Sequence, residues 1–297
     1  MTDPSGGIPF RTQNMRKGDR YIKIGNTLFP CPEFENITDF ITDLPPDQEL
    51  ITVLDKQMGR IILEYDFSYV TKSGHGVRPA EAEAMRLVSK HTSVPVPEVF
   101  FTEFGHGYGS IYMTRIPGSP LEEKWDTLDE KSKESVCLQV WGLISKIRTI
   151  PRPSELQGLF QCAADGSLSR DPLLEDLRDP GRPLMNDSDL RTRIFERYYA
   201  CGGRRFEHQL PDMLPRSDCT VFTHADIAPR NIMVDERNTV TGILDWEYAG
   251  WYPDYWEYAQ ILRPAAAFGG DWSVWMDRTA PQRWDISGIT AARRVLF

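Results

Sequence analysis

Cysteines and long apolar runs are both scarce in this chain. Its 297 residues include five cysteines, an odd number, and none of them belongs to a Cys-x-x-Cys pair. A disulfide framework or a zinc site is therefore not expected, and a reducing compartment is the default. No stretch approaches the roughly 18 consecutive apolar residues of a membrane-spanning helix, and residues 1–18 lack the apolar core of a secretory signal. We therefore expect a cytoplasmic protein without a membrane segment.

Basic residues are in the minority. Lysine and arginine together number 34, against 43 aspartates and glutamates, which gives a net charge of −9. Nucleic-acid binding that does not depend on base sequence needs an excess of basic side chains to displace counterions, so no nucleic-acid partner is expected. An acidic balance instead favours cationic small molecules. Apolar residues make up 40% of the chain and charged residues 26%, which is typical of a globular protein.

The first half of the chain predicts short strands around one helix. Strands are expected where β-branched and aromatic residues cluster between turn residues. They are residues 51–54, 60–63 and 67–71 before the helix, and 99–102 and 111–115 after it. The helix is expected over 79–91, because apolar residues recur there at helical spacing and proline suits a first helical turn.

A glycine-rich segment, residues 105–109, lies between the last two expected strands. We interpret it as a hairpin turn rather than a phosphate-binding loop, since strands flank it on both sides and no helix follows. The sharpest break comes after it, at residues 116–120 (Ile-Pro-Gly-Ser-Pro). Beyond that break the pattern predicts a long amphipathic helix over 129–149 and another helix over 189–201.

The strongest pattern in the chain is a predicted hairpin with polar side chains at its open end. Two apolar runs, residues 232–234 and 240–244, are separated by a polar turn. If the turn is centred, Asn231 before the first run faces Leu244 at the end of the second. Asp245 is one step further along the chain. The hairpin is therefore expected to bring Asn231 and Asp245 together.

Asp226 lies on the loop that leads into the same end of the hairpin, two residues after His224. Oxygen-bearing side chains placed in this way suit Mg²⁺, which takes few protein ligands and shares its other positions with phosphates and water. In kinases one aspartate meets the substrate hydroxyl, while an asparagine and a second aspartate hold the metal. We predict those roles for Asp226, Asn231 and Asp245 respectively. The alternative is that these side chains only cap strands and form turn hydrogen bonds.

The motif His224-Ala-Asp226-x4-Asn231, followed by Asp245-Trp-Glu247, resembles the aminoglycoside phosphotransferase/choline kinase-like family. Further segments are similar to a fungal branch of that family, namely residues 81–86, 94–98, 245–258 and 277–284. The resemblance runs from about Gly59 to the end of the chain. It implies a protein-kinase-like fold.

The fold class implied is α+β, a bilobal protein-kinase-like fold with a β-rich N-terminal lobe and a mainly helical C-terminal lobe. We expect the nucleotide-binding lobe over residues 1–112. Residues 1–25 are candidates for a disordered segment. A hinge is expected over 113–118, and the catalytic and substrate lobe over 119–297.

The resemblance also implies nucleotide-binding residues before the break. Met113 and Arg115 of the hinge would line the adenine site. Lys72 would contact the α and β phosphates and pair with a helix glutamate. Glu81 and Glu83 both flank the apolar face of the expected helix, so periodicity does not choose between them. The family pattern favours Glu83.

The chain departs from the family pattern at a few points. No Gly-x-Gly-x-x-Gly sequence occurs among the first strands, so the loop that covers the nucleotide is not located. Ala225 stands where the family usually has glycine, and Ala228 where it often has histidine. Neither change removes a residue with a predicted role in metal or proton chemistry.

Residues 246–258 mix seven aromatic side chains with three acids, Glu247, Asp254 and Glu257. Aromatic faces together with acids can hold a cationic ligand such as a quaternary amine. Such residues more often pack a helix beneath a catalytic loop. We favour packing and keep the cationic ligand as the alternative.

The sequence therefore predicts an ATP- and Mg²⁺-dependent kinase that moves the γ-phosphoryl group to a hydroxyl of a small molecule, for which a cation is one candidate. A catalytically silent nucleotide- or metabolite-binding module is the alternative, and it would be marked by loss of Asp226, Asn231, Asp245 or Lys72. A protein kinase is disfavoured, because no Ala-Pro-Glu sequence and no long activation loop follow Asp245. The acceptor, the oligomeric state and any role in antibiotic resistance are not indicated.

Overall fold

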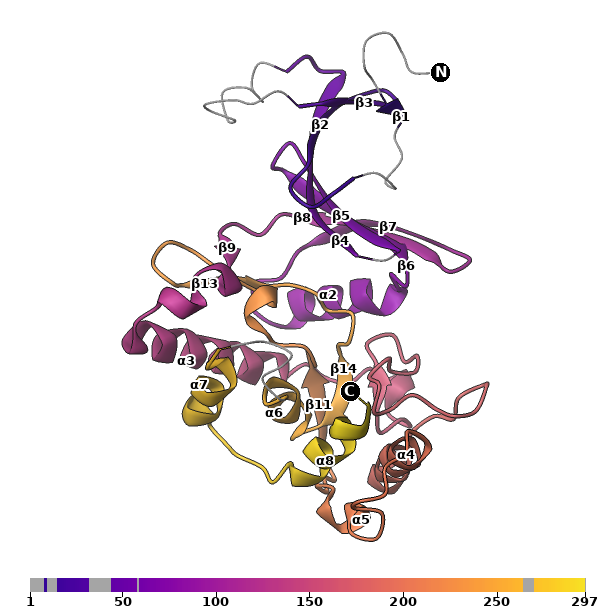
Figure 1. Ribbon diagram of the computed structural model, residues 1–297. Coiled ribbons are helices and arrows are strands. Elements are labelled where there is room, and N and C mark those ends of the chain that lie inside the picture. Colours follow the sequence, from indigo (N-terminus) through magenta and orange to yellow (C-terminus); the bar gives the residue numbers. More distant parts are fainter. Residues whose placement is uncertain (1–7, 10–14, 32–43, 58, 264–269, 297) are drawn as a thin grey trace. The chain divides into compact units, whose positions relative to one another are not determined.

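The computed structural model describes residues 8–9, 15–31, 44–57, 59–263 and 270–296 (Figure 1). The chain divides into two compact units. The first comprises Met1–Pro79 and Pro97–Arg115, and the second comprises Ala80–Val96 and Ile116–Phe297.

The first unit is built on one antiparallel sheet in the strand order β1-β3-β2-β4-β5-β6-β8-β7. The strands are β1 (Ile8–Pro9), β2 (Arg20–Ile24), β3 (Thr27–Pro30), β4 (Gln48–Gln57), β5 (Arg60–Tyr65), β6 (Tyr69–His75), β7 (Val99–Gly105) and β8 (Tyr108–Thr114). Alternate apolar residues of the central strands, such as Ile51, Val53 and Leu63, form the buried core of this sheet. The strands predicted over 51–54, 60–63, 99–102 and 111–115 are thereby confirmed, whereas β1 to β3 were not predicted.

One predicted strand begins later than expected. Asp66 and Phe67 both have left-handed backbone, with φ of 49° and 54°, which is the geometry of a tight hairpin turn between twisted strands. The carboxylate of Asp66 also accepts a hydrogen bond from the amide of Leu50 at 2.7 Å. Strand β6 therefore starts at Tyr69 rather than at Phe67. As a result Lys72 lies inside β6, and not at the end of a strand.

Residues 105–109 form the turn between β7 and β8, as predicted. Strand β7 ends at Gly105, strand β8 begins at Tyr108, and Gly107 between them has a φ of 74°. Because β7 and β8 pair directly as antiparallel neighbours, this glycine-rich segment is a hairpin connection.

The second unit is mainly helical. Its helices are α2 (Pro79–His91, of which Ala80 onward belongs to this unit), α3 (Glu130–Ile147), α4 (Asp187–Ala200), α5 (Leu210–Met213), α6 (Trp256–Ile261), α7 (Trp272–Thr279) and α8 (Ser287–Leu296), with short 3₁₀ helices η2 (Leu121–Glu123), η3 (Trp125–Thr127), η4 (Ser154–Leu156) and η5 (Pro229–Asn231). Its strands form two small sheets, β10-β14-β11 and β13-β12-β9. They are β9 (Ser119–Pro120), β10 (Cys162–Ala163), β11 (Thr220–Thr223), β12 (Ile232–Val234), β13 (Val240–Ile243) and β14 (Gly250–Pro253).

Capping side chains set the starts of the long helices in this unit. Asp129 caps α3, because its carboxylate accepts a hydrogen bond from the amide of Ser132. Asn186 caps α4 in the same way through the amide of Asp189. The helix predicted over 79–91 matches α2 at both ends, and the one predicted over 129–149 matches α3 to within two residues. The helix predicted from residue 189 begins two residues earlier, at Asp187.

The boundary between the units bears on the predicted domains. It falls between Arg115 and Ile116, inside the segment predicted as a hinge. Helix α2 was expected in the N-terminal lobe, but Ala80–Val96 is grouped with the second unit. A backbone hydrogen bond of 3.1 Å from Ile243 to the carbonyl of Pro95 ties this segment to β13. Of the predicted disordered start, residues 1–7 and 10–14 lie outside the described residues, whereas β2 shows that 20–24 are ordered.

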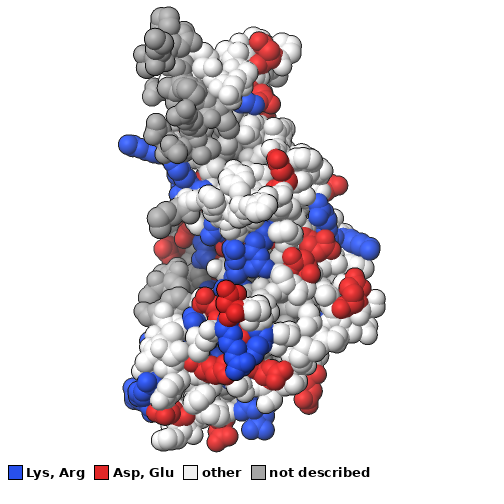
Figure 2. Space-filling model, turned by 90° about the vertical axis from the view of Figure 1, so that its right-hand side faces the viewer, with Lys and Arg blue, Asp and Glu red and all other residues white. Residues whose placement is uncertain are grey.

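No helix among the described residues is long and apolar enough to cross a membrane. On the face that Figure 2 shows, acidic and basic side chains are interspersed. The acidic excess of the chain is therefore not gathered into one patch on that face.

Candidate functional site

The predicted hairpin is formed by β12 and β13. Its register pairs Ile232 with Ile243, and the amide of Leu244 donates to the carbonyl of Asn231 over 2.8 Å. This is the register that the sequence predicts for the open end. Nearer the turn the register shifts at a bulge after Met233. The hairpin therefore places Asn231 opposite the residue before Asp245.

Two residues of this site have left-handed backbone. The φ of Ala225 is 66° and that of Asp245 is 63°. This conformation costs residues with a side chain about 1–2 kcal/mol, and aspartate is among those that tolerate it best. At position 225 a glycine would adopt this geometry without that cost. Strain of this kind is concentrated at functional sites.

Both carboxylate oxygens of Asp226 are engaged. Oδ2 accepts hydrogen bonds from Nδ2 of Asn231 at 2.9 Å and from the guanidinium of Arg230 at 2.6 Å. Oδ1 accepts from the guanidinium of Arg263 at 2.5 Å. The predicted pair of Asp226 and Asn231 is therefore in direct contact. The two arginines were not predicted to take part.

His224 holds the loop to the end of β13. The ring is fully buried, and its Nε2 lies 3.0 Å from the carbonyl oxygen of Leu244. Since a carbonyl can only accept, Nε2 carries the proton. Nδ1 then accepts from the amide of Asp226 at 3.1 Å. Burial lowers the pKa of His224, so the neutral ring that this geometry requires is also the favoured one.

Glu257 of α6 lies beneath the same loop, and its hydrogen bonds to that loop were not predicted. Its Oε2 accepts from the amide of His224 at 2.7 Å, and its Oε1 accepts from the amide of Ala225 at 3.1 Å. Burial raises the pKa of Glu257 to about 7, although the two amide hydrogen bonds oppose the shift. The sequence signal for this role was that Glu257 lies between two aromatic residues, Trp256 and Tyr258. The packing of α6 buries all three side chains.

The raised pKa of Glu257 predicts a pH dependence of stability. A carboxyl group whose pKa rises from 4.5 to about 7 on folding stabilises the protein below pH 4.5, and this contribution is lost as the pH rises through 7. We expect the free energy of unfolding of the wild type to fall, relative to that of Glu257→Gln, by about 3 kcal/mol between pH 5 and pH 8. Urea unfolding of both proteins at the two pH values measures this difference.

The control for this measurement is Glu236→Gln, which removes an exposed carboxylate at the turn of the hairpin. Its unfolding free energy should follow that of the wild type at both pH values. Parallel pH curves for the wild type and Glu257→Gln would show that Glu257 does not titrate as described.

The donor set at the open end of the hairpin fits Mg²⁺. The side-chain amide nitrogen of Asn231 donates to the backbone carbonyl and to the carboxylate of Asp226, which turns its amide oxygen to the other side. That oxygen and the carboxylate of Asp245 are the hard ligands that Mg²⁺ prefers. Among the described residues no group of three or more His, Cys, Asp or Glu side chains could hold a metal ion. An all-protein cage is thus not formed there, and Mg²⁺ does not require one.

The predicted nucleotide residues of the first unit lie on β6, on β8 and directly after β8. Lys72 is buried in β6, where it pairs with Ile62 of β5 and Ile111 of β8. Met113 is buried in β8. Arg115 follows β8, and its guanidinium forms an ion pair with the buried carboxylate of Glu64.

The two candidate glutamates of α2 differ in burial. Glu81 is 3% exposed, whereas Glu83 is only partly buried. A carboxylate that is removed from water needs a partner. Burial therefore separates the two glutamates, which periodicity does not.

The aromatic segment 246–258 packs the interior, as favoured from the sequence. Six of its aromatic side chains are buried, namely Trp246, Trp251, Tyr252, Tyr255, Trp256 and Tyr258, and Tyr248 is partly buried against the same core. The ring of Trp246 meets that of His224 edge to face, with centroids 4.5 Å apart. Trp246 therefore packs against the loop that carries His224, and the buried rings do not form an exposed box for a cation.

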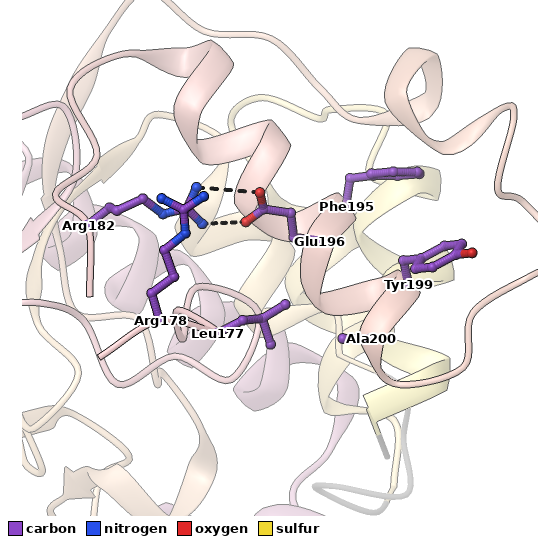
Figure 3. A pocket seen from close by; sticks show the side chains of 7 residues that line it. All are labelled: Leu177, Arg178, Arg182, Phe195, Glu196, Tyr199 and Ala200. Atoms are coloured by element: carbon purple, nitrogen blue, oxygen red, sulfur yellow. Dashed lines mark hydrogen bonds and ion pairs between the residues drawn. The ribbon is translucent and has the colours of Figure 1, made fainter. Parts of the chain in front are cut away.

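A hollow of about 280 Å³ beside α4 is a separate feature of the second unit. Figure 3 shows Arg182 turned toward Glu196, with Phe195 and Tyr199 on the same helix as Glu196. Arg182 forms ion pairs of 2.5 Å with Glu196 and 2.9 Å with Asp176. Because it contains no residue of the 224–245 motif, this hollow is not the candidate active site.

Comparison with known families gives one match over most of the chain. Residues 71–286 match the family described as "Phosphotransferase enzyme family". A comparison with curated proteins finds no significant match to the sequence.

Solved structures with a similar fold are phosphotransferases. The chain is 17% identical to the aminoglycoside-3'-phosphotransferase of type VIII, with a TM-score of 0.54, and the match covers 86% of this chain and 94% of that one. The gentamicin complex of APH(2")-IIa has 13% identity and a TM-score of 0.53, with 83% and 80% of the two chains covered. The ADP-bound APH(2'')-Ib has 11% identity and a TM-score of 0.51, with 82% and 80% covered. At these identities the likeness establishes a shared protein-kinase-like fold.

Proposed function

Since the chain belongs to the phosphotransferase enzyme family, we propose that it transfers the γ-phosphoryl group of ATP to a hydroxyl group of a small molecule, in a reaction that depends on Mg²⁺. The observation that carries the proposal is the contact between Asp226 and Asn231 at the open end of the β12–β13 hairpin. Asn231 lies there opposite Leu244, the residue before Asp245. A chance combination of strand caps has no reason to bring these three residues together.

Asp226 would act on the acceptor. Its carboxylate would orient the acceptor hydroxyl and take its proton as the oxygen bonds to the γ-phosphorus, while the bond from that phosphorus to the bridging oxygen breaks and ADP leaves with the electron pair. The hydrogen bonds from Asn231, Arg230 and Arg263 fix the carboxylate in one position. Most of the rate enhancement would then come from positioning and from stabilisation of charge.

Asn231 and Asp245 would hold Mg²⁺. A bound Mg²⁺ would supply positive charge that stabilises the phosphates during transfer. The left-handed backbone of Asp245 and the neutral His224, which binds the carbonyl of Leu244, keep the end of β13 in place for this role.

Residues of the first unit would bind the rest of the nucleotide. We propose that Lys72 contacts the α and β phosphates, and that Met113 and Arg115 contribute to the adenine site. The side chain of Arg115 is bound to Glu64, so its contribution would come from the main chain.

The glutamate that supports Lys72 can be identified by a matched pair of variants. On burial we propose Glu81, and the family pattern makes Glu83 the competitor. We expect Glu81→Gln to lower kcat/KM for ATP by about 10- to 100-fold, the cost of a lost charge-assisted hydrogen bond, and Glu83→Gln to have little effect. Steady-state kinetics of both variants measure this. The reverse order of the two effects would establish the choice from the family pattern.

The experiment that tests the proposed function is a measurement of ATP consumption with a panel of hydroxyl-bearing metabolites, with Asp226→Asn as the inactive reference. A silent nucleotide-binding module would bind Mg·ATP and consume none with any acceptor. A protein kinase would transfer phosphate to polypeptides and not to the small molecules of the panel.

A further inference from the structure

The approach to Asp226 is lined by guanidinium groups. The side chain of Asp226 is 5% exposed, whereas those of Arg230 and Arg263, which bind its two oxygens, are 40% and 26% exposed. A molecule that brings a hydroxyl to Asp226 therefore meets these arginines first. Two guanidinium groups thus bind the one carboxylate that is assigned to the acceptor.

Arg293 of α8 is a buried guanidinium with unused hydrogen-bonding capacity. The residue is 5% exposed, and its Nη1 donates to the carbonyl of Ala259 at 2.5 Å. Its Nη2 has no hydrogen-bond partner among the described residues. Leaving a buried donor unsatisfied costs about 1–3 kcal/mol, and more when the group is charged. Such a group is expected where a ligand supplies the missing acceptor.

Arg293 belongs to the same cluster as Arg263. Burial lowers the pKa of Arg293 to about 10, with Asp171 opposing the shift and the positive charge of Arg263 adding to it. The positive charge of Arg263 therefore acts on the guanidinium of Arg293. Helix α6 connects them, because Arg293 binds the carbonyl of Ala259 and Arg263 binds that of Gln260.

Two buried acids of the second unit, Asp171 and Glu257, are committed to the fold. Asp171 accepts hydrogen bonds from the amide of Leu173 and from the side chain of Gln260. Glu257 accepts the two backbone amides of the catalytic loop. Neither carboxylate satisfies the open Nη2 of Arg293.

We propose that the acceptor of this phosphotransferase is an anion, and that Arg230, Arg263 and Arg293 bind a carboxylate or phosphate group that it carries near the reacting hydroxyl. This inference rests on the proposed function, since it takes Asp226 as the group that meets the acceptor. It is opposite in sign to the cationic acceptor that the net charge of the chain favours. A polycation would place its charges against the three arginines, whereas an anion would form charge-assisted hydrogen bonds with them.

The test uses four probes that share a three-carbon skeleton with hydroxyl groups and differ in charge: glycerate, glycerol phosphate, glycerol and 3-aminopropane-1,2-diol. Their binding to the full chain loaded with Mg²⁺ and a non-hydrolysable ATP analogue is measured by calorimetry, and their phosphorylation by ADP release from Mg·ATP. We expect one of the two anions to bind about 10- to 100-fold more tightly than glycerol, and the amine to bind most weakly. The two anions distinguish a carboxylate site from a phosphate site.

Variants of the arginines assign the effect to this cluster. We expect Arg293→Gln to remove most of the preference for the anion over glycerol, and Arg293→Lys to retain part of it. The matched control is Arg294→Gln, which removes an exposed positive charge from the next position of α8 and should keep the full preference. Thermal melting of each variant identifies any loss of folding. The Arg263→Gln variant tests the same preference for the anion at a less buried position.

Three outcomes would overturn the inference. They are tighter binding of the amine, equal binding of all four probes, and no binding of either anion up to about 100 mM, a hundredfold above the usual upper range of KM values. The proposed function fails by a different result, the absence of Mg·ATP binding or of transfer to any probe. Anion binding without phosphoryl transfer would support the anion-binding role of the arginines and contradict the proposed kinase activity.

Discussion

The Asp226→Asn variant is expected to lose catalysis while it keeps its nucleotide. An amide cannot take the proton of the acceptor hydroxyl, so kcat should fall by a factor of about 10² to 10⁴, the usual range for a lost general base. The affinity for Mg·ATP should stay close to that of the wild type, because Asp226 is assigned to the acceptor and not to the metal. Acceptor-dependent ADP release and calorimetric titration measure the two quantities.

The controls for this variant concern folding, because Asp226 binds Arg230 and Arg263 as well as Asn231. Retained Mg·ATP affinity and a melting temperature near that of the wild type would show that the loop still holds its shape. The Glu236→Gln variant, at the other end of the hairpin, should be fully active. An unchanged kcat in Asp226→Asn would remove Asp226 from the chemistry and leave its contacts structural.

The Asp245→Asn variant is expected to fail one step earlier, in nucleotide binding. Replacing a carboxylate ligand by an amide weakens the hold on Mg²⁺, so the Kd for ATP in the presence of Mg²⁺ should rise by at least about tenfold, in the range seen when groups that support a metal site are lost. In the presence of EDTA the variant should bind ATP at least as well as the wild type, since it has lost a negative charge that repels the phosphates. Titrations with and without the metal measure both effects.

The metal dependence is the informative part of this experiment. A variant that merely unfolds would lose ATP binding under both conditions. If the variant and the wild type both bind ATP equally well with Mg²⁺ and with EDTA, no metal acts at this site. In that case the convergence of Asn231 and Asp245 would have a structural role only.

The hairpin shows what could be predicted from the sequence. Its register at the open end followed from two apolar runs and a polar turn, and the hydrogen bond between Leu244 and Asn231 confirms it. The bulge after Met233 was not predicted, because the alternation of apolar and polar side chains does not indicate where one strand contains an extra residue. Helices α2 and α3 were predicted well, because each combines a clear period with a proline or aspartate at its start.

The contacts around Asp226 show what could not be predicted. Arg263 binds Asp226 from 37 positions further along the chain, and no periodic pattern links the two. Arg230 lies within the motif, but its direction depends on the turn of η5. Glu257 was noticed only as an acid among aromatic residues, since its role depends on the packing of α6 beneath the loop.

The strands β1 to β3 were missed for a different reason. Strands β1 and β3 have only two and four residues, and basic residues interrupt β2, so the three strands carry little signal of their own. They form because β2 pairs with β4 along its whole length. The start of β6 was misplaced because Asp66 and Phe67 adopt left-handed turn geometry, which an aromatic residue rarely does.

The measurement that tests the central claim most directly follows the phosphoryl group itself. The wild type and Asp226→Asn are incubated with ATP labelled in the γ position, Mg²⁺ and the small-molecule fraction of a cell extract, and the labelled products are separated. We expect an acid-stable phosphate ester on a small molecule that forms with the wild type and not with Asp226→Asn. Label found only in inorganic phosphate or on protein, or found equally with both enzymes, would contradict it.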